Sequence, residues 1–245
     1  MSFFKKLFGG GGPEDRQNDG TDLLRAITFE PQKKKLMKQG QGEVTYLTDN
    51  AVAYLWRLST APDWQWDLRE VEGARAFYGD QCASANGAML EMEICKTGNA
   101  EALRGLFKYR YPPNPLAIMY VGIIWIPFND YCLQLNIESV EMGTTGMREA
   151  LVMTIEMDEG TWVPPVPLEE GQAEPEPIMV KDGEDLLARM ASTKLRKISS
   201  DDPKWDYKFP DHPLTKVRRG LDTCIATIKL PEFFSKCTAY RTRGH

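Results

Sequence analysis

Histidine is the usual proton carrier near neutral pH and the commonest metal ligand, and this chain has only His212 and His245. His212 stands in the run Phe-Pro-Asp-His-Pro-Leu, where it or Asp211 is placed to cap a helix that begins at Pro213. A catalytic His212 needs a nucleophile, and the sequence points to none. We therefore predict a structural role for His212, no catalytic residue and no metal site.

Other motifs with fixed spacing are absent from the sequence. There is no GxxxxGK[ST] phosphate loop, no GxSxG elbow, no HExxH, no CxxC and no complete GxGxxG. The sequence therefore predicts no cofactor. The cysteines are odd in number and widely spaced, which favours reduced thiols in a cytosol; they are Cys82, Cys95, Cys132, Cys224 and Cys237.

Paired carboxylates are the remaining material for acid and base chemistry. Glu91 with Glu93 is one such pair, and Glu70 with Glu72 is another. Arg104 follows on the next expected strand, so the first pair is interpreted as a salt-bridged, solvated face. The second pair suits the start of a helix, where the dipole favours negative charge.

Two further groups of residues are typical of binding surfaces. Basic residues near the C-terminus could bind phosphate, although an exposed helix face or a solvated tail also explains them; they are Lys194 to Lys197, Lys216, Arg218 and Arg219. Tryptophans beside turns or in Pro-rich stretches either cover the core or anchor a partner. The candidates for partner binding are Trp56, Trp64, Trp66, Trp162 and Trp205.

Charge is unevenly distributed along the 245 residues, whose formal net charge is −5. Residues 1–38 carry eight Lys/Arg against five Asp/Glu, residues 39–193 carry ten against twenty-four, and residues 194–245 carry twelve against six. An acidic middle argues against a nucleic-acid groove, which needs a basic face. It favours a basic protein partner instead.

Apolar periodicity predicts an α+β domain. Alternation typical of strands, or a fully apolar run, occurs near residues 44–47, 51–56, 90–94, 107–111, 118–126 and 133–137. Steps of three and four predict helices over 68–82, over 147–155 and after Pro213. In the second helix, Met147 and Leu151 belong to the stripe that we expect to be buried.

The expected organisation has four parts. Residues 1–21 form a flexible tip and Gly-rich linker, 22–157 the main domain, 158–182 an acidic Pro-rich linker and 183–245 a C-terminal helical extension. The tip offers a weak contact with a membrane or a partner, through Phe3, Phe4, Leu7 and Phe8. No secretory signal or membrane span is evident, so we expect no stable membrane insertion and a cytoplasmic location.

The order of two strands, a helix, four strands and a helix over about residues 42–157 resembles the Mog1/PsbP-like sandwich. Two short stretches, 143–148 and 209–214, also resemble segments of uncharacterised bacterial proteins. The resemblance implies an antiparallel sheet of about six strands covered by helices, followed here by a C-terminal helical extension. It also implies a bacterial, non-enzymatic scaffold, because proteins of this fold include partner-binding accessory factors and chaperones for secreted effectors.

Three hypotheses follow. The first is a cytosolic protein-interaction module, such as an immunity protein or an effector-associated chaperone, that binds a basic protein partner. The second is a hydrolase or transferase with an unfamiliar carboxylate-based site. The third is a peripheral membrane adaptor that uses the N-terminal tip.

Overall fold

One antiparallel sheet organises the chain in the computed structural model, which describes residues 20–31, 33–68, 70–98, 100–163 and 194–241. Its seven strands lie in the order β1-β2-β3-β7-β6-β5-β4. The strands are β1 (Lys35–Gly40), β2 (Glu43–Leu47), β3 (Ala53–Thr60), β4 (Ala88–Thr97), β5 (Ala100–Tyr111), β6 (Asn114–Pro127) and β7 (Tyr131–Val140). The helices are α2 (Thr21–Arg25), α3 (Val71–Ser84), α4 (Met147–Asp158), α6 (Pro213–Thr227) and α7 (Glu232–Ser235), with 3-10 turns η1 (Ser199–Asp201) and η2 (Pro203–Trp205).

The α+β class and the antiparallel sheet with helical cover are confirmed, with seven strands where about six were expected. The strand missing from the prediction is β1, which pairs with β2 at the edge of the sheet. Its residues are mostly exposed, and lysines interrupt any apolar alternation. Charged edge strands of this kind protect a sheet from pairing with other chains.

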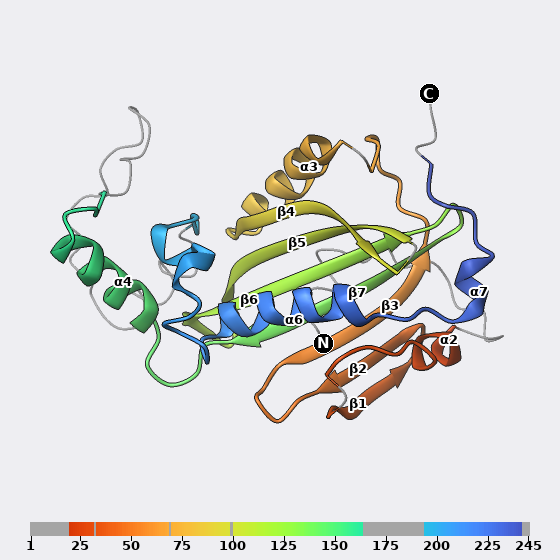
Figure 1. Ribbon diagram of the computed structural model, residues 1–245, viewed down its shortest axis with the longest axis horizontal. Helices are drawn as coiled ribbons and strands as arrows, with labels where there is room; N and C mark the ends of the chain where they lie inside the picture. The colour runs from red at the N-terminus through yellow and green to blue at the C-terminus, as the bar shows by residue number, and fades with distance from the viewer. Residues whose placement is uncertain (1–19, 32, 69, 99, 164–193, 242–245) are drawn as a thin grey trace.

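Helix α6 covers one face of the sheet, which we call the α6 face (Figure 1). Pro213 occupies its first turn, and Nδ1 of His212 accepts the backbone N–H of Leu214 at 3.2 Å. The predicted cap is therefore confirmed. The buried stripe of α6 packs on β6 and β7, and Leu221 lies where Gly122 has no side chain. The C-terminal helix thus completes the core of the sheet.

Helix α3 covers part of the opposite face (Figure 1). Its stripe of Ala74, Tyr78 and Cys82 is buried as predicted. The ring of Tyr78 stacks on Trp125 of β6 with centroids 4.4 Å apart, and its hydroxyl accepts the indole N–H of Trp64. Aromatic packing therefore holds α3 on the sheet.

The β4–β5 hairpin turns at Gly98, whose φ is positive. Glu93 lies directly opposite Arg104, and Arg104 forms ion pairs with both Glu91 and Glu93. The predicted cross-strand pairing is confirmed. Such contacts help to fix the register of a hairpin.

Several expectations concern parts of the chain outside the described residues. The N-terminal tip lies outside them, and so does most of the acidic linker. The described part of the chain contains no helix long and apolar enough to cross a membrane.

Candidate functional site

The structure buries four of the five candidate tryptophans. Trp56 packs against Phe29 on the α6 face, Trp64 and Trp66 stack on each other beside α3, and Trp205 is buried in η2. Trp162 is half-buried after α4. These positions match the alternative interpretation of a cover on the core. That any of the five contacts a partner stays a prediction.

The carboxylate pair Glu91 and Glu93 is neutralised by cations. Oε1 of Glu91 lies 2.7 Å from Nε of Arg218, and Arg104 contacts Glu91, Glu93 and Asp222. Both oxygens of Glu91 are therefore occupied, Oε1 by Arg218 and Oε2 by Arg104, and neither is free to accept a proton from a substrate. This arrangement does not favour the hydrolase hypothesis at this pair.

A second acidic cluster surrounds the capping histidine. Nε2 of His212 lies 3.3 Å from Oε1 of Glu141, and the hydroxyl of Tyr120 donates to Glu149 at 3.4 Å. Burial, together with the carboxylates nearby, raises the pKa of Tyr120 well above its usual value, so this hydroxyl stays protonated. Ligand atoms of Glu141, Glu149 and His212 lie within 4.8 Å of one another, as in a metal centre.

The hydrogen bonds of His212 do not fit a metal ligand. Because Nδ1 accepts the N–H of Leu214, the proton of the neutral ring must be on Nε2. That proton points to Glu141, and no lone pair on Nε2 is left for a cation. Glu141 also accepts the N–H of Ile118 at 3.0 Å. The cluster therefore anchors the start of α6.

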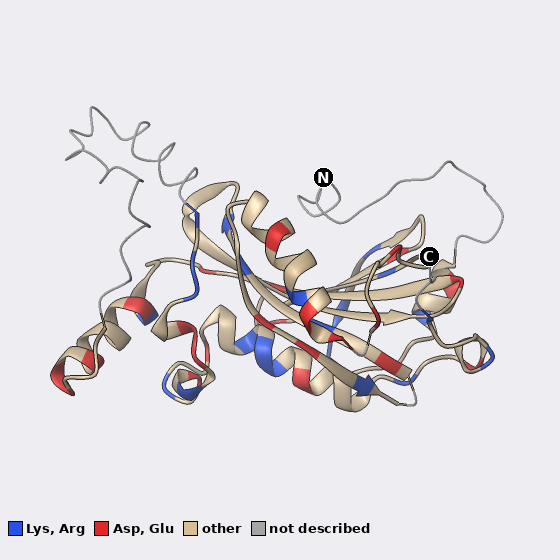
Figure 2. Ribbon diagram, turned by 90° about the horizontal axis from the view of Figure 1, so that it is seen from above, with Lys and Arg blue, Asp and Glu red and all other residues tan. Residues whose placement is uncertain are grey.

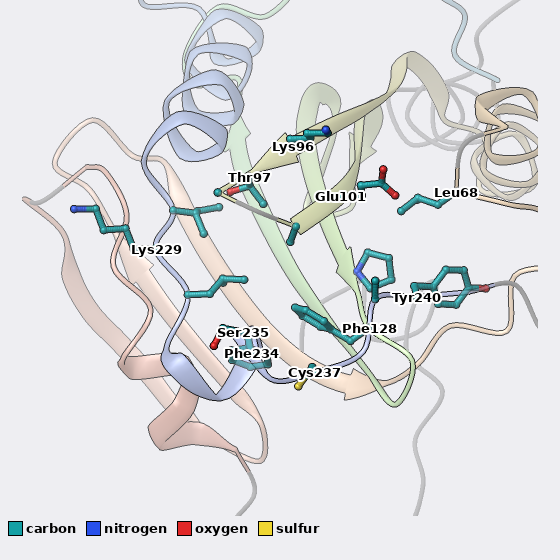
Figure 3. Close-up of a pocket in the computed structure, with 16 residues that line it drawn as sticks. Leu68, Lys96, Thr97, Glu101, Phe128, Lys229, Phe234, Ser235, Cys237 and Tyr240 are labelled. Carbon is teal, nitrogen blue, oxygen red and sulfur yellow. The ribbon is translucent and has the colours of Figure 1, made fainter.

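A cavity of about 670 Å³ lies between the β4–β5 turn and the C-terminal segment (Figure 3). Its wall is mainly apolar, with Phe128, Ile228 and Phe234 among the lining residues. The bridge between Phe128 and Ala239 closes one side. Such a cavity suits an apolar group.

Two side chains of the cavity, Ser235 and Cys237, are of the types that act as nucleophiles in enzymes, but neither is activated here. The hydroxyl of Ser235 donates to the backbone carbonyl of Glu232 at 2.7 Å. Burial raises the pKa of the Cys237 thiol, with Asp130 contributing, so the thiol is held in its protonated, less nucleophilic form. Glu101 also lines the cavity, and among the described residues no hydrogen bond joins it to Ser235 or Cys237.

The buried side of α4 consists of Arg148, Val152 and Glu156, so it is mainly polar, and it attaches the helix to the C-terminal region. The Arg148 side chain, 1% exposed, donates to the Ser200 carbonyl at 2.7 Å, to Thr215 at 2.9 Å and to Asp206 at 2.9 Å. Asp206 also accepts two hydrogen bonds from Nη1 of Arg218. A buried ionic network, rather than an apolar stripe, therefore sets the orientation of α4.

The opposite side of α4 is exposed and apolar, and we call it the α4 face. It consists of Met147, Leu151, Met153 and Met157, with Met142 and Val163 flanking the helix. Met147 is 50% and Leu151 45% exposed, and the flanking Met142 is 81% exposed. The prediction that this stripe is buried is wrong, because Arg148 directs the other side inward. Gly146, with a positive φ, occupies the N-cap of α4, and no side chain caps the helix there.

Acidic residues border the α4 face. Asp158 and Glu159 are exposed at the C-terminal end of the helix, and Glu149 is partly exposed in its first turn. Arg148, the one basic residue of α4, is buried on the other side. Figure 2 shows the acidic end of α4 projecting from the sheet. The sequence signal for this surface is the methionine content of the segment, which also fits a core helix.

The fold and these surfaces define an antiparallel α+β sandwich with a projecting, methionine-rich helix. No model of a known protein family matches the chain, and no curated protein matches it. Among solved structures, the Ran-binding protein Mog1p of Saccharomyces cerevisiae is similar, with 12% identity and a TM-score of 0.36, over 57% of this chain and 80% of that one. A point mutant of Mog1 is also similar, with 12% identity and a TM-score of 0.36, over 55% of this chain and 78% of that one.

Both of these solved structures are of Mog1, one of the proteins after which the fold that the sequence resembles is named. The sheet order and the positions of α3 and α6 themselves define the fold described above.

Proposed function

We propose that this protein is a protein-interaction module that holds a basic, amphipathic segment of another protein on its α4 face. The observation that carries the proposal is the inverted orientation of α4. The helix buries Arg148 and Glu156 and exposes Met147, Leu151 and Met157. Helices of soluble domains normally turn their apolar side inward, so an exposed side that is apolar apart from Thr154 supports a docking surface.

The composition of the α4 face favours a helical or extended segment as its occupant. Methionine is unbranched and polarizable, so it adapts to different apolar partners and is frequent on surfaces that bind several targets. Apolar area removed from water contributes about 25 cal/mol per Å². An amphipathic helix laid along α4 covers Met147, Leu151 and Met157 together, because they lie on one side of the helix.

The charge around the α4 face selects a basic occupant. Asp158 and Glu159 are exposed beside it. The basic residue of the helix itself, Arg148, is buried on the other side in an ion pair with Asp206. Opposite charges on a partner increase the association rate and exclude acidic competitors. This agrees with the acidic middle of the sequence and with the basic partner expected from it.

The test measures direct binding of a defined probe to the full chain. The probe is a fluorescein-labelled helical peptide of leucine and lysine, and its leucine and glutamate analogue is the comparison. We expect the lysine peptide to raise fluorescence anisotropy saturably and the glutamate peptide not to. Leu151→Glu is expected to weaken binding about tenfold or more, since it removes apolar contact and adds a charge to desolvate. Phe77→Glu, on exposed α3, is the matched control and is expected to bind as the unchanged protein does.

Three results would overturn the proposal. One is equal binding of the two peptides, and another is unchanged affinity in Leu151→Glu. The third is that something else occupies the α4 face. If analytical ultracentrifugation shows a dimer that Leu151→Glu dissociates, the occupant is a second copy of this chain. A gain of tenfold or more in peptide affinity when residues 164–193 are replaced by a Gly/Ser linker identifies that segment of the chain as the occupant.

The biological role that we propose within this class is an immunity protein or an effector-associated chaperone in the bacterial cytoplasm. A toxin or secretion gene beside the gene for this protein, encoding a product with a basic amphipathic helix, is the expected finding. Co-expression of that product with the full chain should yield a complex that Leu151→Glu dissociates and Phe77→Glu does not. Its formation in both variants would contradict the role assigned to α4.

A further inference from the structure

A second pocket, of about 500 Å³, lies between α6, the β2–β3 turn and the segment before β1. Its volume is in the range of small-molecule sites. Three basic residues line it, Lys33, Lys216 and Arg219, and they come from distant parts of the sequence. Figure 2 shows basic residues gathered on α6. This pocket is separate from the α4 face.

These cations are not used by the fold. Neither Lys33 nor Arg219 forms an ion pair or a hydrogen bond with the described residues, and Lys216 makes one long bond, 3.4 Å, to the carbonyl of Asn50. In contrast, the neighbouring Arg218 is buried and bound to Glu91 and Asp206. The adjacent arginines of α6 therefore differ in role, and Arg219 is available to a ligand.

A largely buried tyrosine also contributes its hydroxyl to the pocket. Tyr54 is 5% exposed, its ring packs against Phe29 with centroids 5.8 Å apart, and it lines the pocket wall. No partner for its hydroxyl occurs among the described residues. A Cβ on Gly220 would come within 3.3 Å of this oxygen, so glycine at this position leaves room beside it. Burial raises the pKa of Tyr54, so the hydroxyl is a fixed donor at neutral pH.

We propose that this pocket binds the phosphate monoester of a small hydroxylated molecule, such as a sugar phosphate. Arg219, Lys216 and Lys33 neutralise the phosphate, and Tyr54 donates a hydrogen bond to one of its oxygens. Glu30 and Asp49, which also line the pocket, accept hydrogen bonds from hydroxyl groups of the ligand. The same two acids disfavour nucleic acid, whose repeated phosphates need a continuous basic surface.

The test is titration calorimetry of the full chain with ribose 5-phosphate, with ribose and with inorganic phosphate. We expect saturable binding of ribose 5-phosphate, tenfold weaker binding of inorganic phosphate, and none of ribose. Arg219→Gln is expected to weaken ribose 5-phosphate about tenfold or more, because it removes a charge-assisted hydrogen bond. Tyr54→Phe keeps the packed ring and is expected to weaken it several-fold.

Lys96→Gln is the matched control, because Lys96 is an exposed lysine that lines the other cavity and forms no ion pair with described residues. It is expected to bind as the unchanged protein does. Absence of saturable binding at millimolar ribose 5-phosphate would overturn the proposal, and so would equal affinity in Arg219→Gln. Equal affinity for inorganic phosphate and ribose 5-phosphate would show that the pocket recognises only the phosphate group, and it would overturn the proposal of a phosphate monoester as ligand. Circular dichroism of each variant checks that it is folded.

Discussion

The buried ion pair between Lys108 and Asp201 gives the sharpest test of how the C-terminal region is attached to the sheet. Lys108 is on β5 and Asp201 is in η1, and their charged atoms are 2.6 Å apart. Their exposed fractions are 4% and 1%. Apart from this lysine, the Asp201 carboxylate accepts only the N–H of Ile198, at 2.8 Å, among the described residues.

Lys108→Met removes the ammonium group and keeps the length and packing of the side chain. The carboxylate then remains buried with one backbone donor, and breaking such a pair costs about 3–5 kcal/mol. We expect a loss in the upper half of this range, because no second cation among the described residues contacts the side-chain oxygens of Asp201. Asp201→Asn is expected to cost a similar amount by leaving the ammonium uncompensated. The double variant, which buries no charge at this position, is expected to lie within about 2 kcal/mol of the unchanged protein.

Urea denaturation, followed by tryptophan fluorescence and extrapolated linearly, measures these free energies of unfolding. Lys236→Met is the control, since Lys236 and its partner Glu232 are both exposed and their charged atoms lie 2.8 Å apart. Its expected cost is below about 1 kcal/mol. A loss below about 1 kcal/mol for Lys108→Met would refute the reasoning. Additive losses in the double variant would also refute it, because the two charges would then be uncoupled.

Three further outcomes are expected. Gly122→Ala should lower the free energy of unfolding in urea by about 1–3 kcal/mol, because its Cβ would lie 2.7 Å from the Leu221 side chain. In the double variant with Leu221→Ala, the total loss should be smaller than the sum of the two single losses. Strictly additive losses would contradict this contact. Burial raises the pKa of Glu138, which disfavours its charged form in the folded state. The native state therefore loses stability as pH rises through that pKa, and Glu138→Gln should raise the melting temperature at pH 7 but not at pH 3; a gain only at low pH would reverse the sign. Burial also raises the pKa of Cys132 to about 12, so Ellman's reagent should modify the half-buried Cys237 first and Cys132 only on unfolding; rapid native labelling of Cys132 would contradict its burial.

The sequence predicts the strands and the helices that pack on them because their apolar residues repeat with the periods of those elements. For α6, Pro213 and the stripe containing Val217 and Leu221 suffice to predict its start and its buried side. Strand β1 escapes prediction, because an exposed edge strand has no apolar side to repeat. Its pairing with β2 is visible only in the structure.

The candidate surfaces depend on contacts between distant residues, which a local pattern does not contain. The orientation of α4 follows from Arg148 and its partners Ser200 and Asp206, more than fifty residues later. A stripe of methionine and leucine looks the same whether it faces a core or a solvent. Arg219 is a candidate cation in the sequence, but Tyr54 joins it only through packing of α6 on the sheet.

The late position of α6 in the chain has a consequence for synthesis. The strands are complete by Val140, yet the helix that covers one face of them begins at Pro213. A ribosome that has translated residues 1–212 therefore presents Leu135 and Ile137 without their cover. Sequence-distant contacts also slow folding. We therefore expect general chaperones to bind the nascent chain until α6 emerges from the ribosome and covers this face.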